Sequence, residues 1–229
     1  MKTIGIIGGI APESTIEYYR KIIAAYQQLN TTGDYPQIII NSINMLKMLD
    51  LIAAGSMTAV TRYLADEVKK LANAGADFAI MASNTPHIVF DEVQQLSTLQ
   101  LISIVEATCE LITASGLKQV ALFGTKFTMQ GGFYDDVLSI KGIEVIKPDL
   151  EDQNYIHEKY MSELVNGIFL DETRKALLDI IDRLKQHNHI DGLILGGTEL
   201  PLILDKDSIT DIPIFDTTEI HVESVVKLL

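Results

Sequence analysis

The 229-residue sequence lacks the features that mark several common classes of protein. It contains one cysteine, Cys109, which excludes an internal disulfide or a cysteine-based metal cluster and is typical of a reducing compartment. No run approaches the roughly 18 consecutive apolar residues of a membrane-spanning helix. The N-terminal stretch MKTIGIIGGI enters a strand-like pattern without a signal-peptide cleavage region. These absences predict a cytoplasmic protein without a membrane partner.

Positive charge is also scarce, because 18 Lys and Arg residues face 31 Asp and Glu residues and give a formal net charge of −13. No segment concentrates Lys and Arg into a run that could follow a phosphate backbone, so we expect no nucleic-acid partner. The G-x-G-x-x-G spacing of dinucleotide-binding loops is missing too. The first strand-like run is followed instead by Gly8-Gly9, with Pro12 or Ser14 suited to start a helix.

Short β-branched runs alternate with longer amphipathic stretches, and this rhythm predicts a doubly wound α/β fold. The expected strands are residues 4–8, 38–41, 78–82, 101–105, 120–124, 143–146, 192–196 and 212–216. The expected helices include residues 14–28, 56–74, 104–114, 171–186 and 218–229. Eight strands in two sets of four indicate two similar domains, each with a four-stranded parallel sheet.

An internal alignment supports duplication of one domain. Residues 4–8 match residues 120–124 at an offset of 116, and residues 79–83 match residues 193–197 at an offset of 114. We therefore expect domains of residues 1–115 plus 217–229 and of residues 116–216, related by a pseudo-twofold axis. Parallel sheets bind ligands beyond the carboxyl ends of their strands, which places the expected site between the domains.

Polar residues gather at the expected strand ends. Ser83-Asn84-Thr85-Pro86-His87 and Gly197-Thr198-Glu199-Leu200-Pro201 each join a strand to a helix. Amide and hydroxyl groups there can cradle a carboxylate, or can simply cap the following helix. After residues 120–124, Thr125 and Thr128 can donate hydroxyls, and Lys126 adds a positive charge or is simply solvated.

Four motifs, GGIAPEST, SNTPH, LFGTKFTM and LILGGTELPL, occur in this order at strand ends. Together they resemble the aspartate/glutamate racemase family over essentially the whole chain. The resemblance implies proton transfer at the α-carbon of an acidic amino acid or related dicarboxylate, in a homodimer and without a cofactor or metal. It also implies two cysteines that act as acid and base on opposite faces of the substrate.

This sequence departs from the family pattern at both cysteines, because the first position is Ser83 and the second is Gly197. Serine is a poor base without a neighbour to accept its proton, and glycine has no side chain. His87 and Glu199 lie beside these positions and are the remaining candidates for proton transfer or for supporting roles. The candidates for substrate binding are the following residues: Gly9, Pro12, Asn44, Lys47, Asn84, Thr85, Thr125, Thr128, Lys159 and Thr198. Some family members carry an arginine after the second strand, and here Lys47 or Lys159 is the candidate to replace it.

Three functions remain open at the level of the sequence. The first is a racemase-type enzyme acting on aspartate, glutamate or a similar dicarboxylate. The second is a catalytically inactive dicarboxylate-binding protein, in which Gly197 would enlarge the pocket. The third is a lyase or decarboxylase with a single base. Ser83 could also mark an artificially altered form of an active enzyme.

Overall fold

The computed structural model describes residues 2–30, 33–204 and 209–229, and it contains the two predicted four-stranded parallel sheets. The first sheet is formed by β1 (Thr3–Gly8), β2 (Gln37–Ser42), β3 (Phe78–Met81) and β4 (Gln100–Ile102) in the order β2-β1-β3-β4. The second is formed by β5 (Gln119–Gly124), β6 (Glu144–Ile146), β7 (Gly192–Gly196) and β8 (Ile214–Asp216) in the order β6-β5-β7-β8.

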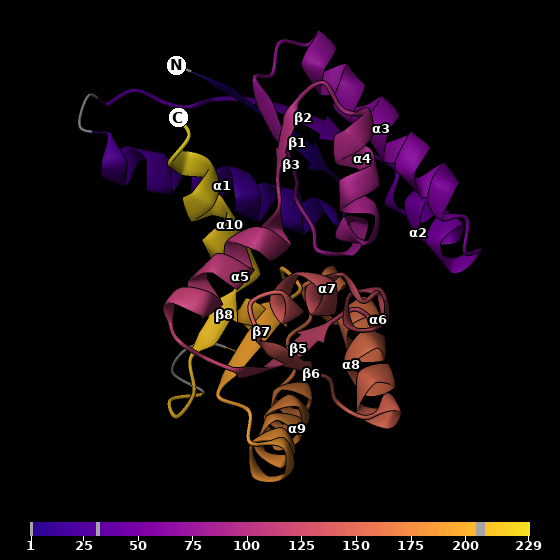
Figure 1. Ribbon diagram of the computed structural model, residues 1–229, viewed down its shortest axis with the longest axis vertical. Coiled ribbons are helices and arrows are strands. Elements are labelled where there is room, and N and C mark those ends of the chain that lie inside the picture. The colour runs from indigo at the N-terminus through magenta and orange to yellow at the C-terminus, as the bar shows by residue number, and fades with distance from the viewer. Residues whose placement is uncertain (1, 31–32, 205–208) are drawn as a thin grey trace. The chain divides into compact units, whose positions relative to one another are not determined.

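Ten α-helices flank these strands in the described part of the chain (Figure 1). They are α1 (Pro12–Leu29), α2 (Met45–Ala53), α3 (Met57–Asn73), α4 (Phe90–Leu96), α5 (Ile104–Ala114), α6 (Lys126–Gln130), α7 (Phe133–Ser139), α8 (Leu150–Ser162), α9 (Asp171–Asn188) and α10 (Thr217–Val226). Three short 3-10 helices are η1 (Thr85–Val89), η2 (Leu164–Asn166) and η3 (Leu200–Leu202).

The chain divides into two compact units. Unit 1 comprises residues 1–104 and 221–229, and unit 2 comprises residues 105–220. Within unit 1, α1 lies on one side of the sheet and α3 and α4 lie on the other (Figure 1). The domain limits and the pseudo-twofold axis expected from the sequence stay predictions.

The core of unit 1 explains how the C-terminal segment is held. Alternating residues of β1 and β3 bury their side chains against the inner face of α1, and α10 adds a further apolar stripe. The cluster consists of Ile4, Ile6, Tyr18, Ile22, Tyr26, Phe78, Ile80, Ala82, Val222, Val225 and Val226. The last residues of the chain thus complete the core that its first strand begins.

Equivalent strands pair in equivalent register in the two units. Ile4 pairs with Phe78 in the first sheet, and Val120, which lies 116 residues after Ile4, pairs with Gly192 in the second. An aspartate before each inner strand also repeats. The carboxylate of Asp77 accepts a hydrogen bond from the Thr3 N–H at 2.7 Å, and that of Asp191 accepts one from the Gln119 N–H at 3.1 Å. These contacts fix the starts of the strands and leave their carboxyl ends for other roles.

Candidate functional site

The loop after β3 places four of the predicted site residues together in unit 1. Ser83 is half-buried, whereas Asn84, Thr85 and His87 are buried. The backbone turns tightly here, since the Ser83 N–H donates to the Met81 carbonyl at 2.8 Å and the His87 N–H donates to the Asn84 carbonyl at 3.0 Å. This turn leads directly into η1 and holds Ser83 at the carboxyl end of the sheet.

The His87 ring supports the backbone around Ser83. Its Nε2 accepts the Ile104 N–H at 3.2 Å, so Nδ1 carries the proton and donates to the Ser83 carbonyl at 3.0 Å. Burial, followed by the nearby His221, lowers the pKa of His87 to about 3. His87 is therefore neutral near pH 7 with both nitrogens occupied, which favours a supporting role over proton transfer.

A second buried histidine, His221 of α10, extends this network. The Tyr18 hydroxyl lies 2.9 Å from Nδ1, and Nε2 lies 2.9 Å from the Ile102 carbonyl, to which it donates. Burial lowers the pKa of His221 to about 4. The His87 and His221 ring centroids are 6.3 Å apart, so two neutral imidazoles fill the interior behind the Ser83 loop.

At the end of β1, Gly9 has φ +79°, a conformation that favours glycine. A Cβ atom there would lie 2.7 Å from the Ile43 carbonyl oxygen, and the Gly9 N–H donates to the Thr15 hydroxyl at 2.7 Å. Pro12 is exposed at the first position of α1. The predicted glycine turn thus forms, with a structural reason for Gly9 that needs no ligand.

At the end of β2, Asn44 caps α2. Its side-chain oxygen accepts the Lys47 N–H at 3.2 Å, and its own N–H donates to the Tyr63 hydroxyl at 3.1 Å. Lys47 is exposed, and its Nζ lies 4.3 Å from the centroid of the Tyr63 ring. Asn44 and Lys47 are therefore both tied to the same tyrosine of α3.

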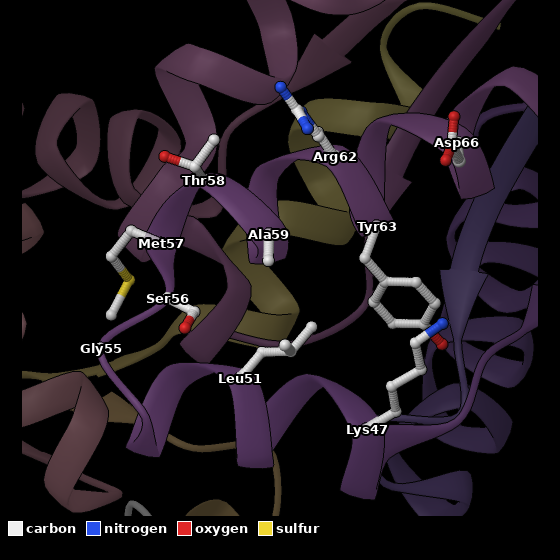
Figure 2. A pocket seen from close by; sticks show the side chains of 10 residues that line it. All are labelled: Lys47, Leu51, Gly55, Ser56, Met57, Thr58, Ala59, Arg62, Tyr63 and Asp66. Carbon is white, nitrogen blue, oxygen red and sulfur yellow. The ribbon is translucent and has the colours of Figure 1, made fainter.

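Figure 2 shows Lys47 and Tyr63 at the rim of a hollow between α2 and α3. The hollow has a volume of about 670 Å³. Its lining consists of Lys47, Leu51, Gly55, Ser56, Met57, Thr58, Ala59, Arg62, Tyr63 and Asp66. Lys47 is the one predicted substrate-binding residue in this lining.

In unit 2, the end of β5 carries a pair of threonines as predicted. Thr125 caps α6 by accepting the Thr128 N–H at 3.2 Å, and the two hydroxyl oxygens are 3.1 Å apart. Thr128 is buried, while Lys126 is exposed and its N–H donates to His157 Nδ1 at 3.3 Å. This loop is polar and held by internal hydrogen bonds, and Lys126 is exposed to solvent.

The end of β7 contains a buried carboxylate bound by two hydroxyls. Thr198 donates to Glu199 Oε2 at 2.6 Å, and the Tyr160 hydroxyl of α8 donates to the same oxygen. Glu199 is 3% exposed and Tyr160 is 6% exposed. Burial and the negative charge of Glu199 raise the pKa of Tyr160 well above its ordinary value.

The expectation that Gly197 enlarges the pocket is wrong. A Cβ atom at Gly197 would lie 2.5 Å from Cε2 and 2.9 Å from the hydroxyl oxygen of Tyr160. The tyrosine ring therefore occupies the space into which a side chain at position 197 would project.

Lys159, the neighbour of Tyr160 on α8, is already paired. Its Nζ lies 2.6 Å from Glu163 Oε1, one helical turn later, and this hydrogen bond raises the pKa of Lys159. Glu163 also accepts the Thr173 hydroxyl at 2.5 Å. A substrate carboxylate that used Lys159 would have to compete with this internal partner.

The structure therefore gathers the predicted residues into two groups. Unit 1 holds one at the ends of β1, β2 and β3. Unit 2 holds the other at the ends of β5 and β7, with Lys159 on α8. Sequence reasoning missed Tyr160 and His221. Tyr160 lies 37 positions before Gly197 and no local pattern links the two, whereas His221 stands in an apolar helix where a buried role could have been expected.

The sequence matches a known protein family over nearly its full length. The model of the Asp/Glu/Hydantoin racemase family matches residues 7–225, nearly the full length of this chain. The chain belongs to that family. The resemblance drawn from the four strand-end motifs is thereby confirmed.

Individual members of the family are similar to this chain over almost all of their length. The broad specificity amino-acid racemase RacX of Bacillus subtilis is 29% identical over 227 residues, which is 98% of this chain and 96% of RacX. An aspartate racemase homologue from Pyrococcus horikoshii has a TM-score of 0.85 and 36% identity, with 100% of this chain and 99% of that chain covered. An aspartate racemase from Picrophilus torridus has a TM-score of 0.78 and 25% identity, with 100% and 94% covered.

The described residues add two further observations. No helix among residues 2–30, 33–204 and 209–229 is long and apolar enough to cross a membrane. In the same residues, no three His, Cys, Asp or Glu side chains gather in an arrangement that could hold a metal ion.

Proposed function

We propose that this protein moves a proton at the α-carbon of an acidic amino acid or a related dicarboxylate. The observation that carries the proposal is the match to the racemase family over residues 7–225, because it includes all four strand-end loops. A homodimer in the cytoplasm, also expected from the sequence and the resemblance, stays a prediction.

Buried neutral donors at these loops support substrate binding. Asn84, Thr85 and Thr128 place amide and hydroxyl groups in positions where water is excluded, so a hydrogen bond to a carboxylate is strengthened. The same donors would stabilise the negative charge that grows on the substrate carboxylate as the α-proton leaves. The chain's net charge of −13 makes such local donors necessary.

Ser83 is the least suited of the candidates to accept a proton from the substrate. Its carbonyl oxygen is held by His87, but among the described residues no side chain hydrogen-bonds its hydroxyl. A serine without a neighbouring base is a weak proton acceptor. We therefore assign Ser83 to binding or to holding a water molecule that carries the proton.

The test is isotope exchange in D₂O with L- and D-aspartate and L- and D-glutamate. Proton NMR follows the loss of the α-proton, and chiral chromatography follows the enantiomer composition. We expect α-proton exchange for at least one of the four substrates. Ser83→Ala should slow that reaction, whereas Ser115→Ala, at the exposed end of α5, should leave it unchanged.

Two results would contradict the proposal. No exchange, together with substrate-induced stabilisation against heat, would identify a binding protein instead. Loss of carbon dioxide without α-proton exchange of the remaining substrate would identify a decarboxylase.

A further inference from the structure

Tyr160 fills the space that the second family cysteine would need. A Cβ atom built on Gly197 comes within 2.5 Å of the Tyr160 ring at Cε2, within 3.0 Å at Cζ and within 2.9 Å of its hydroxyl oxygen. Real Cβ atoms do not approach other atoms this closely, so a side chain at 197 and the ring in this position exclude each other. The phenol thus stands where the resemblance places a proton-transfer group.

The Tyr160 hydroxyl is also coupled to a group that can accept its proton. It donates to Glu199 Oε2, and the Thr198 hydroxyl donates to the same oxygen at 2.6 Å. Two hydroxyl donors to one buried carboxylate oxygen hold that oxygen in place beside the phenol. A phenol and a carboxylate in direct contact form a short path along which a proton can move.

We propose that Tyr160, positioned by Glu199, is the acid/base group that replaces the missing thiol at position 197. The inference rests on the proposed function and assigns a catalytic residue to it. Thr198 completes the arrangement by fixing the carboxylate that Tyr160 contacts.

The proton balance requires both residues. The raised pKa of Tyr160 keeps the phenol neutral near pH 7, so the phenol cannot act as a base alone. In the forward step the substrate Cα–H bond breaks, and its proton bonds to the Tyr160 oxygen while the original phenol proton passes to Glu199. The electron pair left on Cα is delocalised into the substrate carboxylate. In the reverse step Glu199 returns its proton to the phenol as the phenol protonates Cα.

The experiment measures α-proton exchange in D₂O for each enantiomer separately. We expect Tyr160→Phe to slow exchange of one enantiomer by at least about 100-fold, the usual contribution of a general acid or base, with KM changed little. Tyr155→Phe, on the same helix and half-buried beside Lys159, is the matched control and should retain the rate. A loss confined to one enantiomer identifies a role on one face of the substrate, which a general loss of packing would not produce.

Glu199→Gln tests the positioning residue. It should lower kcat for the same enantiomer without a matching rise in KM. Circular dichroism melting curves of all variants establish that they are folded.

Each negative result has a distinct meaning. If the wild type exchanges the α-proton and folded Tyr160→Phe does so at the same rate, the assignment of Tyr160 is wrong and the proposed function stands. Equal losses for both enantiomers would also overturn it, since Tyr160 would then act through packing. If the wild type exchanges no substrate, the proposed function and this inference both fail.

Discussion

At the end of β3 the polar interior is built around two neutral histidines, whereas at the end of β7 it is built around one carboxylate. The strand order and the β1–β3 and β5–β7 registers are equivalent, and an aspartate ties each inner strand to its neighbour in the same way. The backbone contacts of a duplicated unit have thus been retained while the side chains at its functional edge differ. The catalytic or binding role of each strand-end loop must therefore be inferred from that loop's own side chains, and not from the equivalent loop in the other unit.

The largest expected difference between the two units is in how much stability each loses at acidic pH. Because the pKa values of His87 and His221 are lowered in the fold, to about 3 and about 4, from 6.5, their neutral forms stabilise unit 1 above about pH 6.5. This stability is lost as the pH falls from about 6.5 toward those folded values. At pH 5 the loss amounts to about 2 kcal/mol for each histidine, or about 4 kcal/mol together.

Urea unfolding at pH 7.5 and pH 5, with amide hydrogen exchange to separate the units, measures this loss. The exposed His187 supplies the control, since His187→Gln should keep the full pH dependence while His87→Gln loses about half of it. An equal loss of protection in β5 and β7 would show that acid does not distinguish the units.

The next largest effect concerns Gly197. Gly197→Cys should lower the free energy of unfolding by about 1–3 kcal/mol, the usual cost of overpacking, because the new side chain and the Tyr160 ring need the same space. Combining it with Tyr160→Ala removes the conflict. The double variant should therefore be more stable than the sum of the two single losses predicts, by at least about 1 kcal/mol, in a denaturant-based double-mutant cycle. Strict additivity would show that the ring and the side chain at 197 do not compete.

The smallest expected effect concerns helix capping, in which the two units should behave alike. Asn44 caps α2 in unit 1 and Thr125 caps α6 in unit 2, each by accepting a backbone N–H three residues later at 3.2 Å. Replacing either with Ala should cost about 1 kcal/mol in urea unfolding. Ser56→Ala at the start of α3, where no side-chain cap bond forms, should cost less than about 0.5 kcal/mol. Equal costs for all three would mean that the cap bonds add nothing to stability.

Local patterns were sufficient to predict the strands and five of the ten α-helices in the described part of the chain, whereas α2, α4, α6, α7 and α8 were not predicted. Helix α5 begins at Ile104 and ends at Ala114 as expected, and each predicted strand overlaps an observed one. The expected strand at residues 101–105 was extended too far, because its apolar run continues into α5, and periodicity cannot divide such a run. Continuous apolar runs identify buried parallel strands well because both faces of such a strand are covered.

The candidate site was predictable to the extent that it depends on strand ends. The loops carrying Ser83, Thr125 and Thr198 follow β3, β5 and β7 as expected. They were predictable because an apolar run that gives way to polar residues indicates where a buried strand ends. The ion pair between Lys159 and Glu163 could also have been predicted from the sequence, since residues four positions apart on a helix are neighbours.

Other contacts at the site depend on tertiary packing. Nothing local indicates that Tyr160 lies against Gly197, or that the Ile104 N–H occupies one nitrogen of His87. These contacts join segments that meet only in the folded chain, so one sequence cannot reveal them. They are also the contacts that decide which groups are able to move a proton.

The position of the Tyr160 ring constrains how this chain could evolve. A cysteine introduced at 197 has no room while the Tyr160 ring keeps its position, so the ring must turn away or be replaced by a smaller side chain. The effect of a substitution at 197 therefore depends on the residue at 160, and the effect of a substitution at 160 depends on the residue at 197. The two positions, 37 residues apart in the sequence, can change only as a pair.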